Sequence, residues 1–301
     1  MSTDTSPAVR SAAIDVTGAA AAAVAVALWA SAFVAIRDVG AAISPAPLAL
    51  LRLAVAAVAL TVPILVRRST IRLPRERSTW VLIGAYAMLW LAGYTVALNA
   101  AEQQVDAGTA ALLVNLAPLL VAFGAGMFLG EALPRTLFAG MVVSLAGVGA
   151  IALGGAGRHD TGGVLLCLLA AVLYAAGVLV QKPALRRVDP LTAIWLGCLI
   201  GTAVLAPWTP QLITELAHAP ARVLADGVYL GLFPTAIGFT AWSIALRRTA
   251  ASRLTATTYA VPAVSALLSW LALGEVPTVA AAVGGAICLA GVAISRRRAR
   301  A

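Results

Sequence analysis

The sequence predicts an all-α integral membrane protein with ten transmembrane helices, arranged as two inverted five-helix repeats. Three observations predict this fold: long apolar runs along the whole chain, a mean hydropathy of +0.96 with only 11% charged residues, and matching motifs in the two halves. A soluble protein of this length needs more polar surface than such a composition supplies. Apolar runs of about 17–25 residues are long enough to cross a bilayer core as helices.

The apolar runs are separated by short breaks that contain charged residues, proline or glycine. Each run is read as one span because its hydrophobicity is continuous and its length fits the bilayer. The predicted spans are 18–36, 48–66, 79–99, 107–129, 134–153, 162–181, 190–208, 223–246, 253–273 and 278–295. Residues 1–17 and 296–301 are predicted to form short tails, the second of them basic.

Basic residues gather at both chain ends and in every second loop. These residues are Arg10, Arg67, Arg68, Arg72, Arg75, Arg77, Arg135, Lys182, Arg186, Arg187, Arg247, Arg248, Arg253, Arg296, Arg297, Arg298 and Arg300. The alternate loops hold Arg37, Arg158 and Arg222 with seven acids: Asp38, Glu102, Asp106, Asp160, Glu215, Asp226 and Glu275. Basic loops stay on the cytoplasmic side, so both termini are predicted to be cytoplasmic. The net charge of +9 therefore indicates topology rather than a nucleic-acid partner.

An even number of spans is needed to place both termini on one side. The first apolar run could instead be a cleaved signal peptide, because Ala30-Ser31-Ala32 resembles a cleavage site. Its removal would leave nine spans, and Asp4 and Asp15 dilute the basic start. We therefore expect the first run to be a span.

The two halves of the chain carry the same landmarks at nearly constant spacing. Leu-Gly-Glu ends at Glu131 and again at Glu275, 144 positions later. The other matches are Pro118 with Pro262, Gly140 with Gly284, Gly147 with Gly291, Gly18 with Gly163, Trp29 with Tyr174, Arg37 with Lys182, and Pro45 with Pro190. The spacing indicates a duplicated unit of five helices, at 18–153 and 162–295. Because five is odd, the second unit is predicted to be inverted, as in secondary transporters that work by alternating access.

Several segments resemble one known family. LWASAFVAIR at 28–37, Arg52 in the second span, AGTAALLVNLAPLL at 107–120 and the two Leu-Gly-Glu units resemble the drug/metabolite transporter superfamily, EamA type, over residues 18–295. The resemblance implies ten helices in two inverted repeats and the export of small metabolites, often amino acids, across the bacterial inner membrane. Two positions depart from the family: Ala30 replaces a common glycine, and Gly197 stands where an arginine would match Arg52.

The substrate is expected near the midplane, where helices are locally broken. Pro118 and Pro262 lie near the middle of their spans, and each removes a backbone donor and frees a carbonyl one turn earlier. The predicted substrate-lining residues are Trp29, Ser31, Phe33, Trp90, Tyr94, Asn115, Pro118, Tyr174, Trp242, Tyr259 and Pro262. Ordinary packing is the alternative role, since membrane helices tolerate aromatic residues and proline kinks.

Three charged residues are candidates for gating or structural roles. Arg52 lies four residues inside the second span, where an outer gate or an ion pair with Asp38, Glu102 or Asp106 is favoured over direct binding of an anion. Glu131 and Glu275 each precede a new helix, so helix capping is favoured over gating.

No metal, cofactor or catalytic set is predicted. The sequence lacks a nucleophile–base set and a carboxylate pair at one depth, which argues against an enzyme. Cys167, Cys198 and Cys288 all fall inside spans, as packing residues do. No acid or histidine is placed at mid-membrane, with His159 and His218 in outer loops, which favours facilitated efflux over proton coupling.

Two other functions and one assembly question stay open. A multidrug or quaternary-cation carrier would favour an aromatic pocket with an embedded acid, and a non-transporting scaffold needs only packing. The fifth and tenth spans are rich in small residues, which permit close helix contact either within the monomer or in a homodimer. These residues are Gly140, Ser144, Gly147, Gly284, Gly285 and Gly291. The expected partners are the lipid bilayer and a small-molecule substrate.

Overall fold

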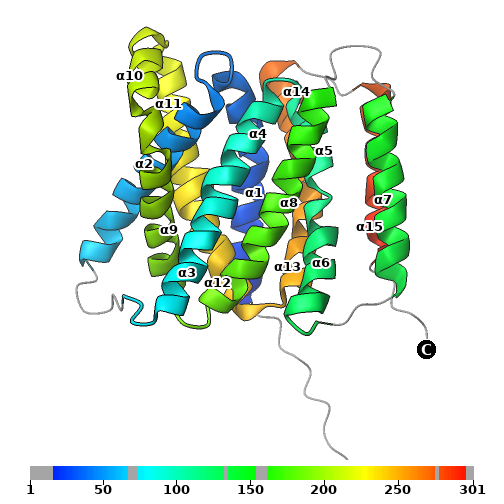
Figure 1. Cartoon of the computed structure of the whole chain (residues 1–301). Helices are drawn as coiled ribbons and strands as arrows, with labels where there is room; N and C mark the ends of the chain where they lie inside the picture. Colours follow the sequence, from blue (N-terminus) through cyan, green and yellow to red (C-terminus); the bar gives the residue numbers. More distant parts are fainter. Residues whose placement is uncertain (1–15, 67–72, 132–134, 154–160, 275–277, 296–301) are drawn as a thin grey trace, which may run out of the picture.

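The computed structural model describes residues 16–66, 73–131, 135–153, 161–274 and 278–295, and within these ranges every regular element is a helix (Figure 1). The elements of the first half are α1 (Val16–Val39), α2 (Pro45–Val66), α3 (Arg77–Tyr86), η1 (Ala87–Tyr94), α4 (Thr95–Glu102), α5 (Ala107–Val114), α6 (Ala117–Phe128) and α7 (Arg135–Leu153). Those of the second half are α8 (Thr161–Ala184), α9 (Pro190–Leu205), η2 (Ala206–Trp208), α10 (Thr209–His218), α11 (Ala221–Leu230), η3 (Gly231–Gly238), α12 (Phe239–Arg248), α13 (Ala251–Thr255), η4 (Ala256–Ala260), α14 (Val261–Leu273) and α15 (Val279–Ser295).

Seven helical segments of the described chain are long and apolar enough to cross a membrane. They are Val16–Val39, Pro45–Val66, Arg77–Glu102, Ala107–Phe128, Thr161–Ala184, Pro190–His218 and Ala221–Arg248. The other three predicted spans coincide with α7, with α13 to α14, and with α15, whose apolar stretches are shorter. The prediction of a multi-pass helical membrane protein is confirmed, and the count of ten crossings stays a prediction.

The first helices of the two halves run in opposite directions. At the end of α1, the Gln103 side chain donates to the carbonyl of Gly40 at 2.9 Å. Gly163, near the start of α8, lies against the side chains of Gln104 and Val105. Thus α8 begins at the end of the molecule where α1 finishes. We call this the upper end and the opposite one the lower end, as drawn in Figure 1.

Equivalent helices of the two halves are irregular at equivalent places. The π-helical segments η1 and η3 are each eight residues long and lie 144 positions apart. The fourth helix of the first half breaks after α5, at Asn115, and its counterpart tightens into the 3₁₀ segment η4. Pro118 and Pro262 follow these breaks, in the first turns of α6 and α14, as their ring chemistry predicts. Within η3, Pro234 is a comparable signal, because proline removes a backbone donor inside the helix, whereas η1 contains no proline. Such π-helical segments often mark functional sites.

The Leu-Gly-Glu motif ends a helix in each half. Gly130 and Gly274 both have positive φ, of 71° and 68°, a backbone conformation that glycine adopts without steric cost. After Gly130, the Glu131 N–H donates to the carbonyl of Ala125 at 3.1 Å, which closes the end of α6. The repeated glycine is therefore a structural requirement of the helix end.

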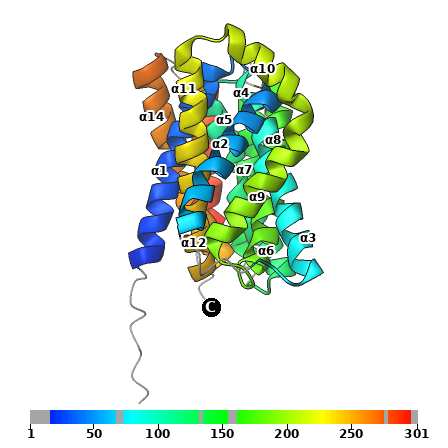
Figure 2. The ribbon, with the colours of Figure 1, turned by 90° about the vertical axis from the view of Figure 1, so that its left-hand side faces the viewer.

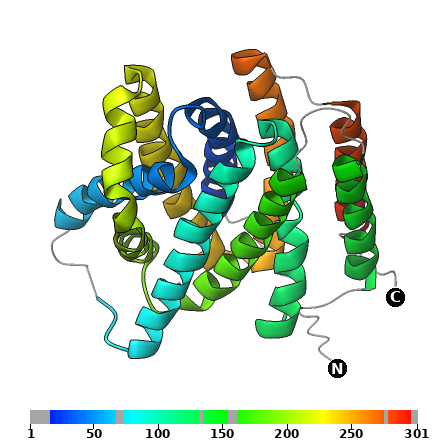
Figure 3. The same ribbon diagram turned by 45° about the horizontal axis from the view of Figure 1, so that its top comes forward.

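The small residues of α7 and α15 face each other within the monomer. A Cβ atom at Gly291 would lie 2.4 Å from Ser144 Oγ and 2.5 Å from the carbonyl oxygen of Gly140. The two helices stand side by side at one edge of the bundle (Figures 1 and 3). Their glycines are therefore explained by an intramolecular contact, and a homodimer stays a prediction without support from this pattern.

Three sequence-based expectations need correction. Residues 209–222 were expected to form a loop, but α10 fills most of it and carries His218 (Figure 2). Hydropathy misses α10 because it is amphipathic and largely exposed. Glu102 was also placed in a loop, but it is the last residue of α4 and only 1% exposed. Arg52 lies seven residues inside α2, because the helix begins at Pro45. Its Cα atom therefore lies about 10 Å along the helix from its first residue, rather than the roughly 6 Å that the predicted span gives.

Candidate functional site

Aromatic side chains from both repeats meet in one cluster inside the bundle. The ring of Trp90 in η1 stacks on that of Tyr174 in α8, with centroids 4.8 Å apart. Trp29 in α1 contacts Trp242 and Phe239 of α12, at 4.9 and 5.1 Å between centroids. Trp29 and Tyr174, which hold equivalent positions in the repeats, lie 6.3 Å apart. The cluster is therefore built at the boundary between the two repeats.

Small residues and an irregular helix hold these rings in place. The indole Nε1–H of Trp29 donates to the carbonyl of Pro234, inside η3, at 3.2 Å. A Cβ atom at Gly177 would lie 2.4 Å from the Cβ of Trp90, so only glycine lets α8 approach this ring so closely. The π-helical segments thus supply both the ring of Trp90 and the acceptor for Trp29.

A cavity of about 20 Å³ lies within this cluster. It is lined by Trp29, Ala32, Phe33, Ile36, Arg52, Trp90, Tyr94, Leu98, Tyr174 and Phe239. This volume is room for about one water molecule. The central cavity is therefore nearly closed in this conformation, and a substrate would require the surrounding helices to move apart.

Five of the predicted substrate-lining residues line this central cavity: Trp29, Phe33, Trp90, Tyr94 and Tyr174. Trp242 is fully buried and packs behind Trp29. Ser31 lies on the opposite face of α1, where its hydroxyl bonds that of Tyr229 at 2.6 Å. The remaining four lie at the breaks before α6 and α14 and are not part of this lining: Asn115, Pro118, Tyr259 and Pro262.

The sequence analysis missed several lining residues that helical spacing could have found. Ala32 and Ile36 follow Trp29 by three and seven positions, which places them on its face of α1. Phe239 precedes Trp242 by three positions on α12. Leu98 is an ordinary apolar residue, and no local pattern distinguishes it.

Arg52 is buried and reaches the central cavity from α2. Its side chain is 4% exposed, and Nη1 donates to Asn99 Oδ1 at 3.3 Å. Asn99 in turn donates to the carbonyl of Pro45 at 2.9 Å. Of the three acids expected as partners, the carboxylate of Glu102 interacts electrostatically with the guanidinium.

The other two acids have different partners. Asp38 accepts from Arg222, and Asp106 caps α5 by accepting from the Thr109 N–H at 2.8 Å. Glu102 is buried, but it is the last residue of α4, so the expectation that no acid lies at mid-membrane stays a prediction.

Two larger cavities open at the upper end. One, of about 650 Å³, is lined by Arg37, Asp38, Gly40, Ala41, Glu102, Gln103 and Leu273. The other, of about 520 Å³, lies between α1, α11 and α14 and is lined by Ser31, Val34, Ala35, Asp38, Arg222, Asp226, Tyr229, Leu268, Leu271, Ala272 and Leu273. Helix α1 separates this second cavity from the central one, because Ser31 and Trp29 lie on its opposite faces.

Charged side chains tie the repeats together at the lower end. The carboxylate of Glu131 accepts from the N–H groups of Ala251 and Ser252, at 3.0 and 3.3 Å, and from the Ser252 hydroxyl. The carboxylate thus caps α13 of the other repeat. Residues 132–134, which join Glu131 to the helix that follows it, lie outside the described residues, so the expected capping of that helix stays a prediction. Glu275 lies outside the described residues.

Arg37 and Lys182, which hold equivalent positions in the two halves, each donate to backbone carbonyls at the end of the third predicted span of their own half. Arg37 Nη1 donates to the carbonyl of Glu102 at 2.6 Å, at the upper end. Lys182 Nζ donates to the carbonyls of Leu246 and Thr249, at the lower end. Leu246 is the counterpart of Glu102, so the same tie occurs at both ends of the bundle. Such paired ties are suited to a molecule that opens at one end and closes at the other.

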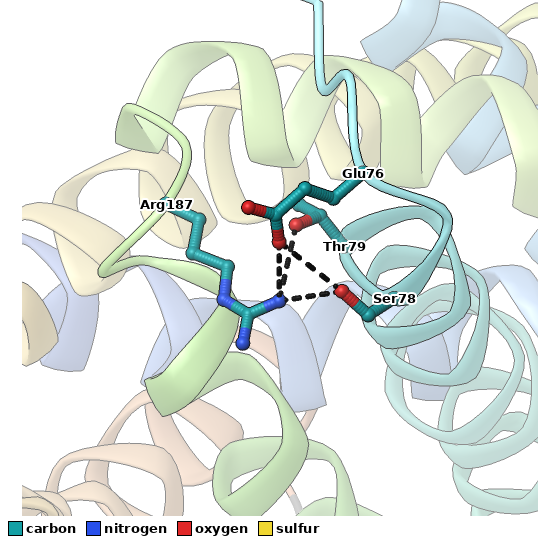
Figure 4. Close-up of polar contacts among 4 residues, drawn as sticks. All are labelled: Glu76, Ser78, Thr79 and Arg187. Atoms are coloured by element: carbon teal, nitrogen blue, oxygen red, sulfur yellow. Dashed lines mark hydrogen bonds and ion pairs between the residues drawn. The ribbon is translucent and has the colours of Figure 1, made fainter.

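The lower end also has an exposed polar contact, drawn in Figure 4. Arg187 Nη1 lies 3.0 Å from Glu76 Oε2 and donates to the Ser78 hydroxyl at 2.7 Å. The two charged side chains are 45% and 69% exposed. Because water screens them, this ion pair contributes about 0–1 kcal/mol.

The described residues contain no group of three or more His, Cys, Asp or Glu arranged to hold a metal ion. Two helical repeats surround an aromatic cavity, and charged side chains make hydrogen bonds at each end of the bundle. This arrangement is typical of membrane transporters built from internal repeats. The chain belongs to the EamA-like transporter family, whose sequence model matches residues 16–153 and again residues 161–297. The resemblance found in the sequence is thereby confirmed.

Individual relatives agree with this family. The chain is 38% identical over 273 residues, 90% of each protein, to a probable terminal-alkyne amino-acid exporter of Streptantibioticus cattleyicolor. It is 29% identical over 216 residues, 70% of this chain and 74% of the relative, to the aromatic amino acid exporter YddG of Ancylobacter novellus. A solved crystal structure with 23% identity covers 94% of this chain and 99% of its own, with a TM-score of 0.67, and shows the same fold.

Proposed function

We propose that this transporter exports amino acids or closely related small metabolites across the bacterial inner membrane by alternating access. The proposal includes ten crossings in two inverted repeats, with both termini in the cytoplasm and the lower end facing inward. The central aromatic cavity is the substrate site. The site is lined by Trp29, Phe33, Trp90, Tyr94 and Tyr174. The hydrogen bonds of Arg37 at the upper end, and those of Lys182 and Glu131 at the lower end, help to close the two ends of the transporter.

The observation that carries the proposal is the composition and place of the central cavity. Its walls come from both repeats, and the π-helical segment η1 supplies Trp90 and Tyr94. Binding there would couple the substrate to the relative position of the repeats, which alternating access requires. Two relatives named as amino-acid exporters support the substrate class.

The structure weakens the alternative of quaternary-cation efflux. Aromatic walls attract cations through their π faces, but the charged side chain that lines this cavity is Arg52, which is itself cationic. A cationic substrate would have to approach this guanidinium. A non-transporting scaffold gives no account of the repeat-related π segments.

Counterflow in proteoliposomes tests the proposal. Purified protein is reconstituted with a panel of unlabelled amino acids inside, and uptake of each labelled compound is measured with and without a protonophore. We expect saturable exchange of at least one apolar or aromatic amino acid. Insensitivity to the protonophore supports facilitated transport, and sensitivity supports proton coupling.

Matched tryptophan variants locate the site. Trp29→Ala removes a ring of the central cavity and is expected to reduce exchange by about tenfold or more, because a buried aromatic contact is worth several kcal/mol. Trp270→Ala is the control, since Trp270 in α14 is 56% exposed. Equal exchange by the two variants would place the substrate site elsewhere. No exchange of any compound by folded wild-type protein would refute the proposed function.

A further inference from the structure

The guanidinium of Arg52 has unused hydrogen-bonding capacity next to the central cavity. It offers five N–H donors, and Nη1 donates to the neutral amide of Asn99. Its Nε is buried and has no hydrogen-bond partner among the described residues. A charged group within a membrane bundle is costly and normally marks a functional position. Arg52 therefore has a donor available for a ligand.

The rest of the cavity wall is apolar or aromatic. Apart from Arg52, the lining consists of Trp29, Ala32, Phe33, Ile36, Trp90, Tyr94, Leu98, Tyr174 and Phe239. Such a site has one polar end and a broad hydrophobic body. It matches a small molecule with a single anionic group on an apolar or aromatic side chain. Arginine suits a carboxylate in particular, because its planar fork can donate two parallel hydrogen bonds.

A buried acid lies on the other side of the guanidinium. Glu102 follows Asn99 by one turn of α4 and interacts electrostatically with Arg52. It also lines the 650 Å³ cavity at the upper end. Because a buried carboxylate already lies near the guanidinium, a zwitterion, which adds no net charge, suits this site better than a net anion. Arg52 lines the central cavity and Glu102 lines the cavity of the upper end.

We propose that Arg52 is the substrate-binding residue that holds the carboxylate of a zwitterionic α-amino acid, whose apolar or aromatic side chain contacts the rings of the central cavity. The inference rests on the proposed function. It adds the group of the substrate that is recognised and the residue that recognises it. A substrate that lacks an ionised carboxylate leaves the guanidinium without its partner and binds more weakly.

The test compares amino acids with their carboxamides in the counterflow assay. Unlabelled L-phenylalanine, L-phenylalaninamide, L-leucine and L-leucinamide compete against the labelled amino acid that wild-type protein exchanges. The amides keep the shape and the ammonium group but lose the negative charge. We expect wild-type protein to prefer each acid over its amide by about tenfold or more, as for a lost charge-assisted hydrogen bond.

The same comparison in variants assigns the preference to Arg52. Arg52→Gln is expected to weaken exchange and to reduce the preference for the acid to about one, because the preference depends on this guanidinium. Arg187→Gln is the matched control, since it makes the same chemical change at an exposed residue of the lower end. It is expected to keep wild-type exchange and preference. Arg52→Lys keeps the charge without the fork and is expected to be intermediate.

The outcomes separate this inference from the proposed function. Equal competition by acid and amide in wild-type protein overturns the inference, and so does a preference that survives in Arg52→Gln. In both cases amino-acid exchange itself still supports the proposed function. If Arg52→Gln does not fold, judged by size-exclusion chromatography, then Arg52→Lys and the wild-type comparison decide the question. Absence of exchange by wild-type protein refutes the proposed function and with it the inference.

Discussion

Replacing Glu131 with glutamine is expected to open the lower end of the transporter. The Glu131 carboxylate joins the end of α6 to the first residues of α13, where it accepts two backbone N–H groups and the Ser252 hydroxyl. These two elements belong to different repeats. Glutamine has nearly the same shape but carries no charge and offers one acceptor oxygen, so the variant weakens this contact without leaving a cavity.

The size of the effect follows from the contact. A hydrogen bond to a charged group contributes about 1.5–3 kcal/mol, and Glu131 accepts several. The side chain is half-buried, which lowers its contribution through solvent screening. We expect a loss of about 2 kcal/mol in the closed state, which corresponds to a rise of about 30-fold in the ratio of open to closed lower ends.

A buried cysteine measures this opening. Thr255 is one turn beyond Ser252 in α13 and fully buried, so Thr255→Cys is the reporter, in a background without Cys167, Cys198 and Cys288. Protein in nanodiscs is treated with a membrane-impermeant maleimide. Glu131→Gln is expected to raise the labelling rate by about 30-fold, because labelling follows the open population when opening and closing are fast.

The exposed contact in Figure 4 provides the control. Glu76→Gln makes the same chemical change at the lower end, in an ion pair worth about 0–1 kcal/mol, so its labelling rate is expected to change less than about fivefold. The reporter is present in all variants and its own effect cancels. Equal labelling rates for Glu131→Gln and Glu76→Gln would refute the assignment of Glu131 to a gate.

Three further predictions concern the packing of α7 against α15, the hydrogen bonds of Lys182 and the two faces of α1. Gly291→Ala inserts a methyl group between α7 and α15 and is expected to lower the free energy of unfolding by about 1–3 kcal/mol, measured by thermal unfolding. Gly84→Ala is the control, because Gly84 has open space around it and its replacement should be neutral or stabilising. Equal melting temperatures of the two variants would contradict the close contact between α7 and α15. Lys182→Met removes two carbonyl ties and should raise labelling of the cysteine reporter by about tenfold, and an unchanged rate would exclude Lys182 from the gate. Phe33→Ala should reduce exchange several-fold more than Ser31→Ala, because only Phe33 faces the central cavity, and the reverse order would place the substrate on the other face.

The helical segments and the duplication were accessible from the sequence because local chemistry encodes them. Apolar length sets the spans, proline sets the helix starts and breaks, and a glycine with positive φ closes a helix at Gly130 and again at Gly274. Part of the central cavity was also accessible. Trp29 and Tyr174 were paired by their equivalent positions, and the structure brings their rings together.

Residue environments were less accessible, because they depend on the partners that each side chain meets. Hydropathy placed Glu102 in a loop, since a charged residue ends an apolar run, yet α4 extends as far as Glu102 and the side chain is buried. The pattern around Glu131 suggested a cap for the next helix. Its carboxylate also reaches α13, which is 120 positions away in the chain. Neither contact has a counterpart in local sequence.

Residue type and spacing are enough to identify this chain as a duplicated helical membrane protein, because they set its spans, breaks and repeats. The three-dimensional packing is needed to find which residues share the central cavity, that α1 presents Phe33 to it and Ser31 to another groove, and that Arg52 reaches it with a donor unused by the described residues. The physical reason is that the rotation of each helix about its axis is fixed by packing against helices distant in sequence. A rotation by two residues, about 200°, exchanges the two faces.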